Sequence, residues 1–139
     1  MPGEAKESGK SSELRIRTRE FALRIINLSV RLPRRAETQV IGRQVLRSGT
    51  SIGAQYHAGC RSRSDAEFVS KLRGALREAE ETNHWLVLLS ESGFVKPARL
   101  ENLLQETDEI IAMLTASVKR VKSRRSPSSA PKEESTECA

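Results

Sequence analysis

The sequence predicts an all-α protein built as an antiparallel up-and-down four-helix bundle. Aromatic residues make up only 4% of the chain and eight glycines occur among its 139 residues, too few for the short strands and tight turns of an all-β fold. Apolar residues instead recur every three or four positions in four segments. The connections between these segments are short, so consecutive helices are expected to lie side by side in opposite directions.

The first two helices are expected over residues 13–32 and 36–58. Pro33 ends the first, and Gly59 is expected to cap the C-terminal end of the second. The buried stripe of the first comprises Phe21, Ile25, Leu28 and Leu32, and that of the second Ile41, Val45, Ser48, Ile52 and Tyr56.

The third helix is expected to start after Ser64, whose spacing from Glu67 is that of a capping box, and to end at Gly93. The fourth starts near Pro97 and has an almost heptad repeat. The expected stripes are Val69, Leu72, Leu76, Ala79, Asn83 and Leu86 in the third helix, and Leu100, Leu103, Thr107, Ile110, Leu114 and Val121 in the fourth.

The chain is expected to contain one bundle domain, residues 13–122, between two polar tails, residues 1–12 and 123–139. Both tails contain too few apolar residues to offset the entropy of ordering, so they are predicted to be disordered. The longest apolar run, Trp85 to Leu89, is five residues, too short for a membrane span or a secretion signal. Cys60 and Cys138 have neither disulfide-framework nor metal-ligand spacing, and a cytoplasmic location is predicted.

Charge is distributed in blocks along the chain. Residues 13–63 contain eleven Lys and Arg against three Asp and Glu, residues 64–116 contain five against ten, and residues 117–126 contain five cations without an acid. This asymmetry indicates either a basic surface for a polyanion or complementary faces that meet within or between subunits. The cations of the first block are all arginine, which binds phosphate bidentately and stacks on bases. The predicted nucleic-acid-binding set is Arg15, Arg17, Arg24, Arg31, Arg34, Arg35, Arg43, Arg61 and Arg63.

No catalytic or metal-binding motif appears, so the protein is predicted not to be an enzyme and to need no cofactor or metal. His57 and His84 lack partner patterns and are expected to be surface or interface residues. Glu78, Glu80 and Glu81 are expected to form a solvated or salt-bridged helix face. An enzyme using Glu78, Glu81 and His84 is the weakest alternative.

Gly49 and Gly53 resemble a phosphate loop only superficially, since no Gly-Lys-Ser/Thr sequence follows. Each glycine inside a helix costs about 1 kcal/mol relative to alanine, so a pair four residues apart suggests close approach of a neighbouring helix. Arg47 precedes this segment. Its expected partner is Glu78 or Glu81, and the alternative is an Arg47 that faces a ligand.

Three stretches resemble a known bacterial family: Gln44–Ala54 (QVLRSGTSIGA), Asp65–Leu72 (DAEFVSKL) and Ala75–Leu86 (ALREAEETNHWL). The family comprises four-helix bundle proteins encoded in intervening sequences of large-subunit ribosomal RNA genes. It is related to the accessory variability determinant of diversity-generating retroelements. The resemblance covers about residues 14–121, and the matching signature positions are Arg47, Ser48, Gly49, Thr50, Ser51, Ile52 and Gly53 in the second helix and Glu78, Glu81 and Trp85 in the third.

The resemblance implies an antiparallel bundle that assembles into a homopentameric barrel with a basic surface or channel and has no enzymatic activity. Several apolar residues lie off the main stripes, namely Leu14, Ile16, Ile26, Val30, Trp85, Val87 and Leu88. They independently suggest a subunit interface, or alternatively a thicker single core. The predicted function is binding of nucleic acid, structured RNA in particular, through the arginine-rich surface. The alternative is a protein-interaction accessory factor, for example one that docks a reverse transcriptase of such a retroelement.

Overall fold

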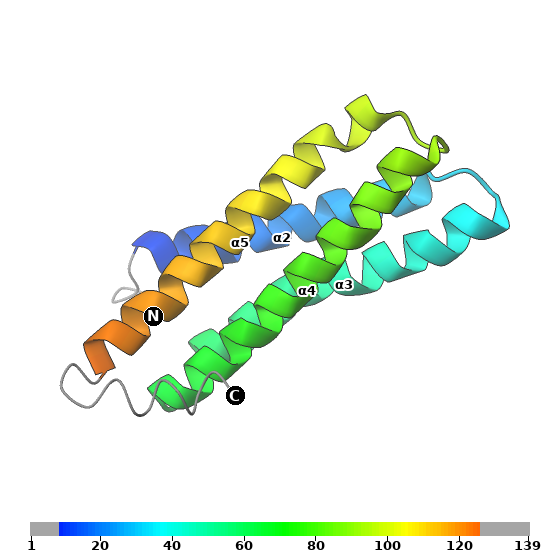
Figure 1. The fold of residues 1–139 in the computed structure, drawn as a ribbon. Coiled ribbons are helices and arrows are strands. Elements are labelled where there is room, and N and C mark those ends of the chain that lie inside the picture. The colour runs from blue at the N-terminus through cyan, green and yellow to red at the C-terminus, as the bar shows by residue number, and fades with distance from the viewer. Residues whose placement is uncertain (1–8, 126–139) are drawn as a thin grey trace.

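The computed structural model describes residues 9–125, and their side chains from 13 to 124. This part of the chain consists of four long helices and contains no strand. They are α2 (Gly9–Val30), α3 (Ala36–Cys60), α4 (Asp65–Ser92) and α5 (Pro97–Arg125). The all-α prediction is therefore confirmed. Figure 1 shows the helices running back and forth along one axis, with α2 beginning at the end of the bundle where α3 and α5 finish.

Each helix packs against its neighbours in the sequence, and α5 returns to contact α2. This pattern of neighbours is that of an up-and-down bundle. The α3–α4 interface is the most extensive, whereas α2 and α5 share the smallest interface. The bundle is thus held most tightly along α3 and α4.

The helix ends follow local rules of capping. Ser64 Oγ accepts a hydrogen bond from the backbone N–H of Glu67 at 3.1 Å, as predicted. Gly93 ends α4 with a φ of 83°, a left-handed conformation that glycine adopts without strain. The prediction for Gly59 is wrong: α3 continues to Cys60, and Gly59 is buried inside it. A Cβ there would lie 2.9 Å from Leu72 Cδ1, so this glycine allows α4 to approach.

Two predicted boundaries also shift. Helix α2 begins at Gly9, inside the predicted N-terminal tail, and α5 continues to Arg125, beyond the predicted end of the domain at residue 122. The predicted disorder of residues 1–8 and 126–139 lies outside the described residues.

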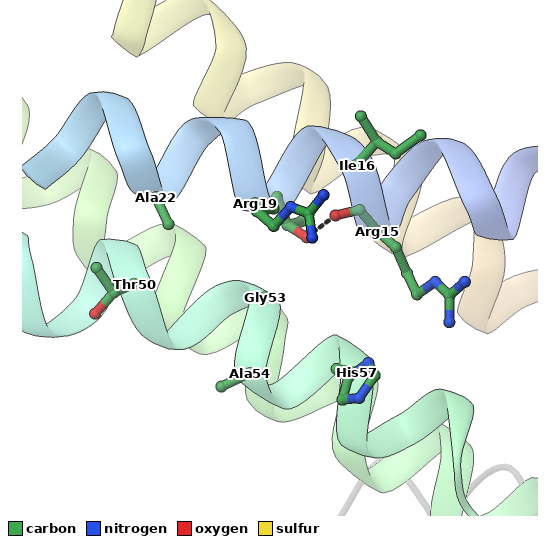
Figure 2. A pocket seen from close by; sticks show the side chains of 9 residues that line it. Arg15, Ile16, Arg19, Ala22, Thr50, Gly53, Ala54 and His57 are labelled. Carbon is green, nitrogen blue, oxygen red and sulfur yellow. Dashed lines mark hydrogen bonds between the residues drawn. The ribbon is translucent and has the colours of Figure 1, made fainter.

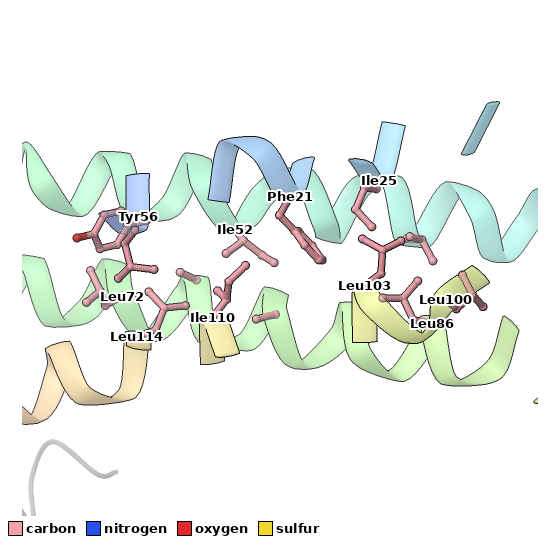
Figure 3. Packing of buried hydrophobic residues seen from close by; sticks show 14 of the residues in the cluster. Phe21, Ile25, Ile52, Tyr56, Leu72, Leu86, Leu100, Leu103, Ile110 and Leu114 are labelled. Atoms are coloured by element: carbon pink, nitrogen blue, oxygen red, sulfur yellow. The ribbon is translucent and has the colours of Figure 1, made fainter. Parts of the chain in front are cut away.

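The core is a row of mainly aliphatic side chains along the bundle axis, together with the aromatic Phe21 and Tyr56 (Figure 3). Every position of the stripe predicted for the last helix is buried. In α2, Leu14 is 1% exposed and belongs to the core, so the thicker-core alternative holds for this residue. Four residues predicted to be in the stripes are only half-buried, namely Leu28, Ile41, Leu76 and Asn83.

The difference in α4 has a polar cause. Thr82, not Asn83, faces α3, and its hydroxyl donates to Ser48 Oγ at 2.8 Å while also lying 2.7 Å from the carbonyl oxygen of Glu78. The Ser48 hydroxyl lies 2.9 Å from the carbonyl oxygen of Gln44. Because both hydroxyls have partners, they can be buried between α3 and α4 without an unmet hydrogen bond.

Small residues on α3 let α2 come close, as predicted. A Cβ on Gly49 would lie 2.9 Å from Ile25 Cγ1, and one on Gly53 would lie 3.2 Å from Thr18 Oγ1. Thr18 is itself buried and donates to the carbonyl oxygen of Leu14 at 2.8 Å. Gly49 and Gly53 therefore have a packing role, because they allow α2 and α3 to lie close together.

Candidate nucleic-acid interface

The arginines predicted to bind nucleic acid are spread over three regions of the bundle. Two of these regions are the opposite ends, and the third comprises the long sides of α2 and α3. Arg24 on α2 and Arg31 directly after its last residue follow Arg17 by seven and fourteen residues and so share its helix face. Those with exposed side chains are Arg24, Arg31, Arg34, Arg35, Arg43, Arg61 and Arg63, whereas Arg15 and Arg17 are half-buried. The neighbouring Arg19 is also exposed.

Arg17 does not lie on an open basic surface. Its Nε and Nη2 atoms donate to the two carboxylate oxygens of Glu106 at 2.9 and 2.7 Å, and Nη2 also contacts Glu109 at 2.5 Å. Glu13 lies 3.7 Å away on the same helix. The hydrogen bonds with Glu106 and Glu109 raise the pKa of Arg17 above its ordinary value. The hydrogen bond from Arg17 lowers the pKa of the Glu109 carboxyl. Arg17 therefore joins α2 to α5, and its charge is neutralised by acids of its own chain.

Arg47 has the carboxylate partners that the sequence predicts. Its guanidinium contacts Glu78 at 3.4 Å and also forms an ion pair with Glu81. The Trp85 indole N–H donates to the same Glu81 carboxylate at 3.0 Å. The predicted salt bridge is thus confirmed, and it ties α3 to α4 on the outside of the buried Ser48–Thr82 contact.

One end of the bundle gathers cations from distant parts of the sequence. Arg63, in the α3–α4 connection, and Arg124, in the last turn of α5, line one pocket of about 310 Å³. Arg61 and Lys122 are close in the sequence to these two residues. Asp65 also lines the pocket, so the end is predominantly but not wholly basic. We call Arg61, Arg63, Lys122 and Arg124 the basic end.

The opposite end is formed by the α2–α3 and α4–α5 connections. The guanidinium carbon of Arg35 lies 4.6 Å from the centre of the Phe94 ring, a cation–π arrangement that holds the arginine in place. Its Nε atom is also 3.8 Å from Glu37, and both side chains are more than half exposed. Because that ion pair is solvated, it contributes little to stability.

A groove of about 450 Å³ runs between α2 and α3 (Figure 2). Its floor consists of small and apolar groups, including Ala22, Gly53 and Ala54, and Ile16 forms part of its wall. The cationic or titratable groups at its edge are Arg15, Arg19 and His57. No carboxylate of the described residues lines this groove, which we call the α2–α3 groove.

Neither histidine has the surroundings of a catalytic or metal-binding group. His57 is exposed at the edge of the α2–α3 groove, and His84 packs edge-on against Trp85 with 4.9 Å between ring centres. Among residues 9–125, no three or more His, Cys, Asp or Glu side chains come together as metal ligands. In the same range, no helix combines the length and apolarity needed to cross a bilayer.

Sequence reasoning missed two features of this surface. The acids that neutralise Arg17 are on α5, 89 and 92 positions away, and periodicity cannot pair an arginine with a particular distant carboxylate. The one sequence signal for this pairing was that Glu106 and Glu109 lie on the side of α5 that faces α2. Likewise, the cationic end of α5 and the α3–α4 connection form separate clusters in the sequence, and only the bundle topology joins them.

Comparison with known proteins identifies relatives with this fold. Residues 10–116 match the family model described as 23S rRNA-intervening sequence protein. A crystal structure from Bacteroides thetaiotaomicron, described as a protein with unknown function from the S23 ribosomal protein family, superposes with a TM-score of 0.72 at 37% identity. The match covers 76% of this chain and 98% of that one. A search of curated proteins found no match.

Proposed function

Because the chain belongs to the 23S rRNA-intervening sequence protein family, we propose that it binds nucleic acid, with structured RNA as the favoured ligand, and catalyses no reaction. The basic end carries this proposal. There, Arg63 and Arg124 line one pocket although they come from different parts of the chain. Several cations on one surface bind phosphates together and release counterions, which favours a polyanion over a single small anion.

The proposed contact surface extends from the basic end along α2 and α3. It retains the exposed arginines of the predicted set and excludes Arg17, whose guanidinium is already paired with Glu106 and Glu109. Few exposed aromatic side chains are available on which bases could stack, since the chain has only five aromatic residues. The contacts are therefore mainly to phosphates, and binding depends on RNA shape more than on base sequence.

The test is binding of a structured RNA and a duplex DNA at about 50 and 200 mM salt, in a filter-binding assay. The variant combines Arg61→Gln, Arg63→Gln and Arg124→Gln. Each lost phosphate contact lowers the salt slope by roughly 0.7 to 0.9, so we expect the triple variant to lower it by about 2 or more.

The matched control removes three exposed cations elsewhere, Arg77→Gln, Lys96→Gln and Arg99→Gln. Both variants lose the same net charge, so a nonspecific charge effect alters both equally. Equal losses in the two variants, or no binding by the folded parent protein at the lower salt, would overturn the proposal.

We also propose that the protein is a homo-oligomer, with the pentamer that the family resemblance implies as the expected state. The observation that supports it is an outward apolar stripe on α2: Ile16, Leu23 and Val30 are spaced by seven and are 53%, 60% and 77% exposed. An apolar row left open on a helix favours contact with another surface. Leu23→Glu with Val30→Glu is expected to lower the mass measured by light scattering, whereas Glu80→Lys on α4 leaves it unchanged. An unchanged mass in the α2 variant would contradict this interface.

The second candidate function is that of an accessory factor that docks a protein, as the related retroelement determinants suggest. The α2–α3 groove favours it, because an apolar floor with cationic edges suits an acidic amphipathic segment. The partner implied by the resemblance is a reverse transcriptase. We expect a reverse transcriptase encoded beside the gene to copurify with the parent protein. We expect it not to copurify with an Ala54→Trp variant, in which the new side chain fills the groove. Equal copurification with both proteins would remove this candidate.

A further inference from the structure

We propose that the acidic part of the chain's own C-terminal segment, residues 132–139, occupies the α2–α3 groove and competes there with nucleic acid. The competition rests on the proposed function, whereas the docking itself does not. The segment reads KEESTECA and carries Glu133, Glu134 and Glu137 against a single lysine. This acidic stretch follows the cationic end of α5 in the sequence.

The groove suits this occupant in charge. Arg15, Arg19 and His57 stand at its edge, and the described residues that line it include no carboxylate. The pocket at the basic end is less suitable, because Asp65 lines it beside Arg63 and Arg124. Carboxylates of the segment therefore meet less repulsion in the groove than in the pocket at the basic end.

The groove also suits the apolar residues that precede the acids. Ala130 and Pro131 come directly before Lys132, and the groove offers a shallow floor of Ala22, Gly53 and Ala54. Gly53 has no side chain, and a Cβ there would lie only 3.2 Å from Thr18 Oγ1 of α2, so the two helices stay close beneath the groove. Ala130 and Pro131, just before the acidic segment, can therefore lie along this floor while the carboxylates that follow them reach the edge.

The length of the segment allows it to reach the groove. Arg124 lines a pocket together with Gly59, and His57 of the groove is two residues before Gly59 in the same helix, a rise of roughly 3 Å. Glu133 follows the end of α5 by eight residues, which span up to roughly 26 Å when extended. This length is about twice the diameter of a helix with its side chains, roughly 10–12 Å, so the segment can pass around the end of the bundle.

The docking is tested by disulfide crosslinking in the full chain, which needs no nucleic acid. Cys60→Ser leaves Cys138 as the one native thiol. A second thiol is introduced by Ala54→Cys in the groove or, as the control, by Ala66→Cys in the first turn of α4. Both alanines are exposed. Ala66 is in the first turn of α4, and α4 begins at the end of the bundle where α5 finishes (Figure 1).

A docked segment raises the effective concentration of Cys138 at the groove. We therefore expect the intrachain crosslink under a mild thiol oxidant to form at least about threefold faster with Ala54→Cys than with Ala66→Cys. Replacing Glu133, Glu134 and Glu137 with glutamine should abolish the preference. Equal rates, faster crosslinking to the control, or only interchain products would overturn the docking.

The competition is tested by RNA binding at about 50 mM salt. Three exposed ion pairs together change an affinity by roughly threefold or more, so the glutamine triple variant is expected to bind RNA at least that much more tightly. The control, Glu80→Gln with Glu91→Gln and Asp108→Asn, raises the net charge equally at exposed positions outside the groove. Equal gains would overturn the competition. Preferential crosslinking by a protein that binds no RNA would uphold the docking and overturn the proposed function instead.

Discussion

Arg17 and Arg19 are two residues apart on α2, and we expect their replacement to have opposite consequences. Arg17 is three-quarters buried and donates twice to a Glu106 carboxylate that is 18% exposed. Arg19 is exposed at the edge of the α2–α3 groove and forms no ion pair with any described residue. Arg17→Gln should therefore lower stability with little effect on RNA binding, and Arg19→Gln should do the reverse.

The magnitude follows from the hydrogen bonds. A buried hydrogen bond to a charged group contributes about 1.5–3 kcal/mol to stability. Partial exposure reduces this contribution toward the smaller values of surface ion pairs. Losing the pair with Glu106 should thus lower the free energy of unfolding by about 1–2 kcal/mol. Each kcal/mol corresponds to a fall in Tm of roughly 4 °C or more for a domain of this size. Arg19→Gln should change stability by less than about 0.5 kcal/mol.

The stability assay is urea unfolding followed by circular dichroism at 222 nm, and the binding assay is the salt dependence of RNA affinity. We expect only Arg19→Gln to reduce the salt slope, by roughly 0.7 to 0.9. A matching reduction in the Arg17→Gln variant would refute the reasoning, because it would mean that an arginine paired with two carboxylates still contributes to phosphate binding. An unchanged Tm for Arg17→Gln would refute the inference that the Arg17–Glu106 pair stabilises the bundle.

Two further predictions concern packing and pH. Gly49→Ala should destabilise the protein by about 1–3 kcal/mol, because the new methyl group would lie 2.9 and 3.1 Å from Cγ1 and Cγ2 of the β-branched Ile25 in a tight helix contact. Gly74→Ala should be neutral or stabilising by up to about 1 kcal/mol, because its new neighbour is the flexible end of Gln55; equal urea midpoints for the two variants would contradict this. The pKa of Glu109 is lowered in the folded state, so its stabilising contribution is present above about pH 4.3 and is lost as acid protonates it. The fall in Tm between about pH 5 and pH 3 should be shallower in Glu109→Gln, and an identical slope would show that this carboxylate is not responsible.

The fold could be predicted from the sequence because its signals are local. The heptad-like stripe of α5, the Ser64 cap and the left-handed Gly93 each depend on residues within one or two turns, and all were found. The errors lie where a neighbouring helix decides the outcome. Gly59 has the composition of a helix cap but serves the close approach of α4.

The candidate site was only partly predictable for the same reason. Arginine clusters on α2 and in the connections are visible in the sequence, but whether a given arginine is open or neutralised depends on α5. Arg17 was predicted to face nucleic acid together with Arg15 and Arg24, and its bidentate contact with Glu106 sets it apart. Arg47 could be paired correctly because an arginine beside a close helix crossing needs a carboxylate partner, and Glu78 and Glu81 offer one on the next helix.

The contact between Trp85 and Glu81 lets tryptophan fluorescence report on the part of α4 that lies beside the Arg47 ion pair. Trp85 is the only tryptophan in the sequence, and its indole N–H is held by the carboxylate that also holds Arg47. All tryptophan emission therefore comes from this one site on α4, next to the ion pair that joins α4 to α3. Since α2 and α5 share the smallest interface, separation of those two helices can proceed while the emission stays native, and the order in which the bundle opens becomes visible without a label.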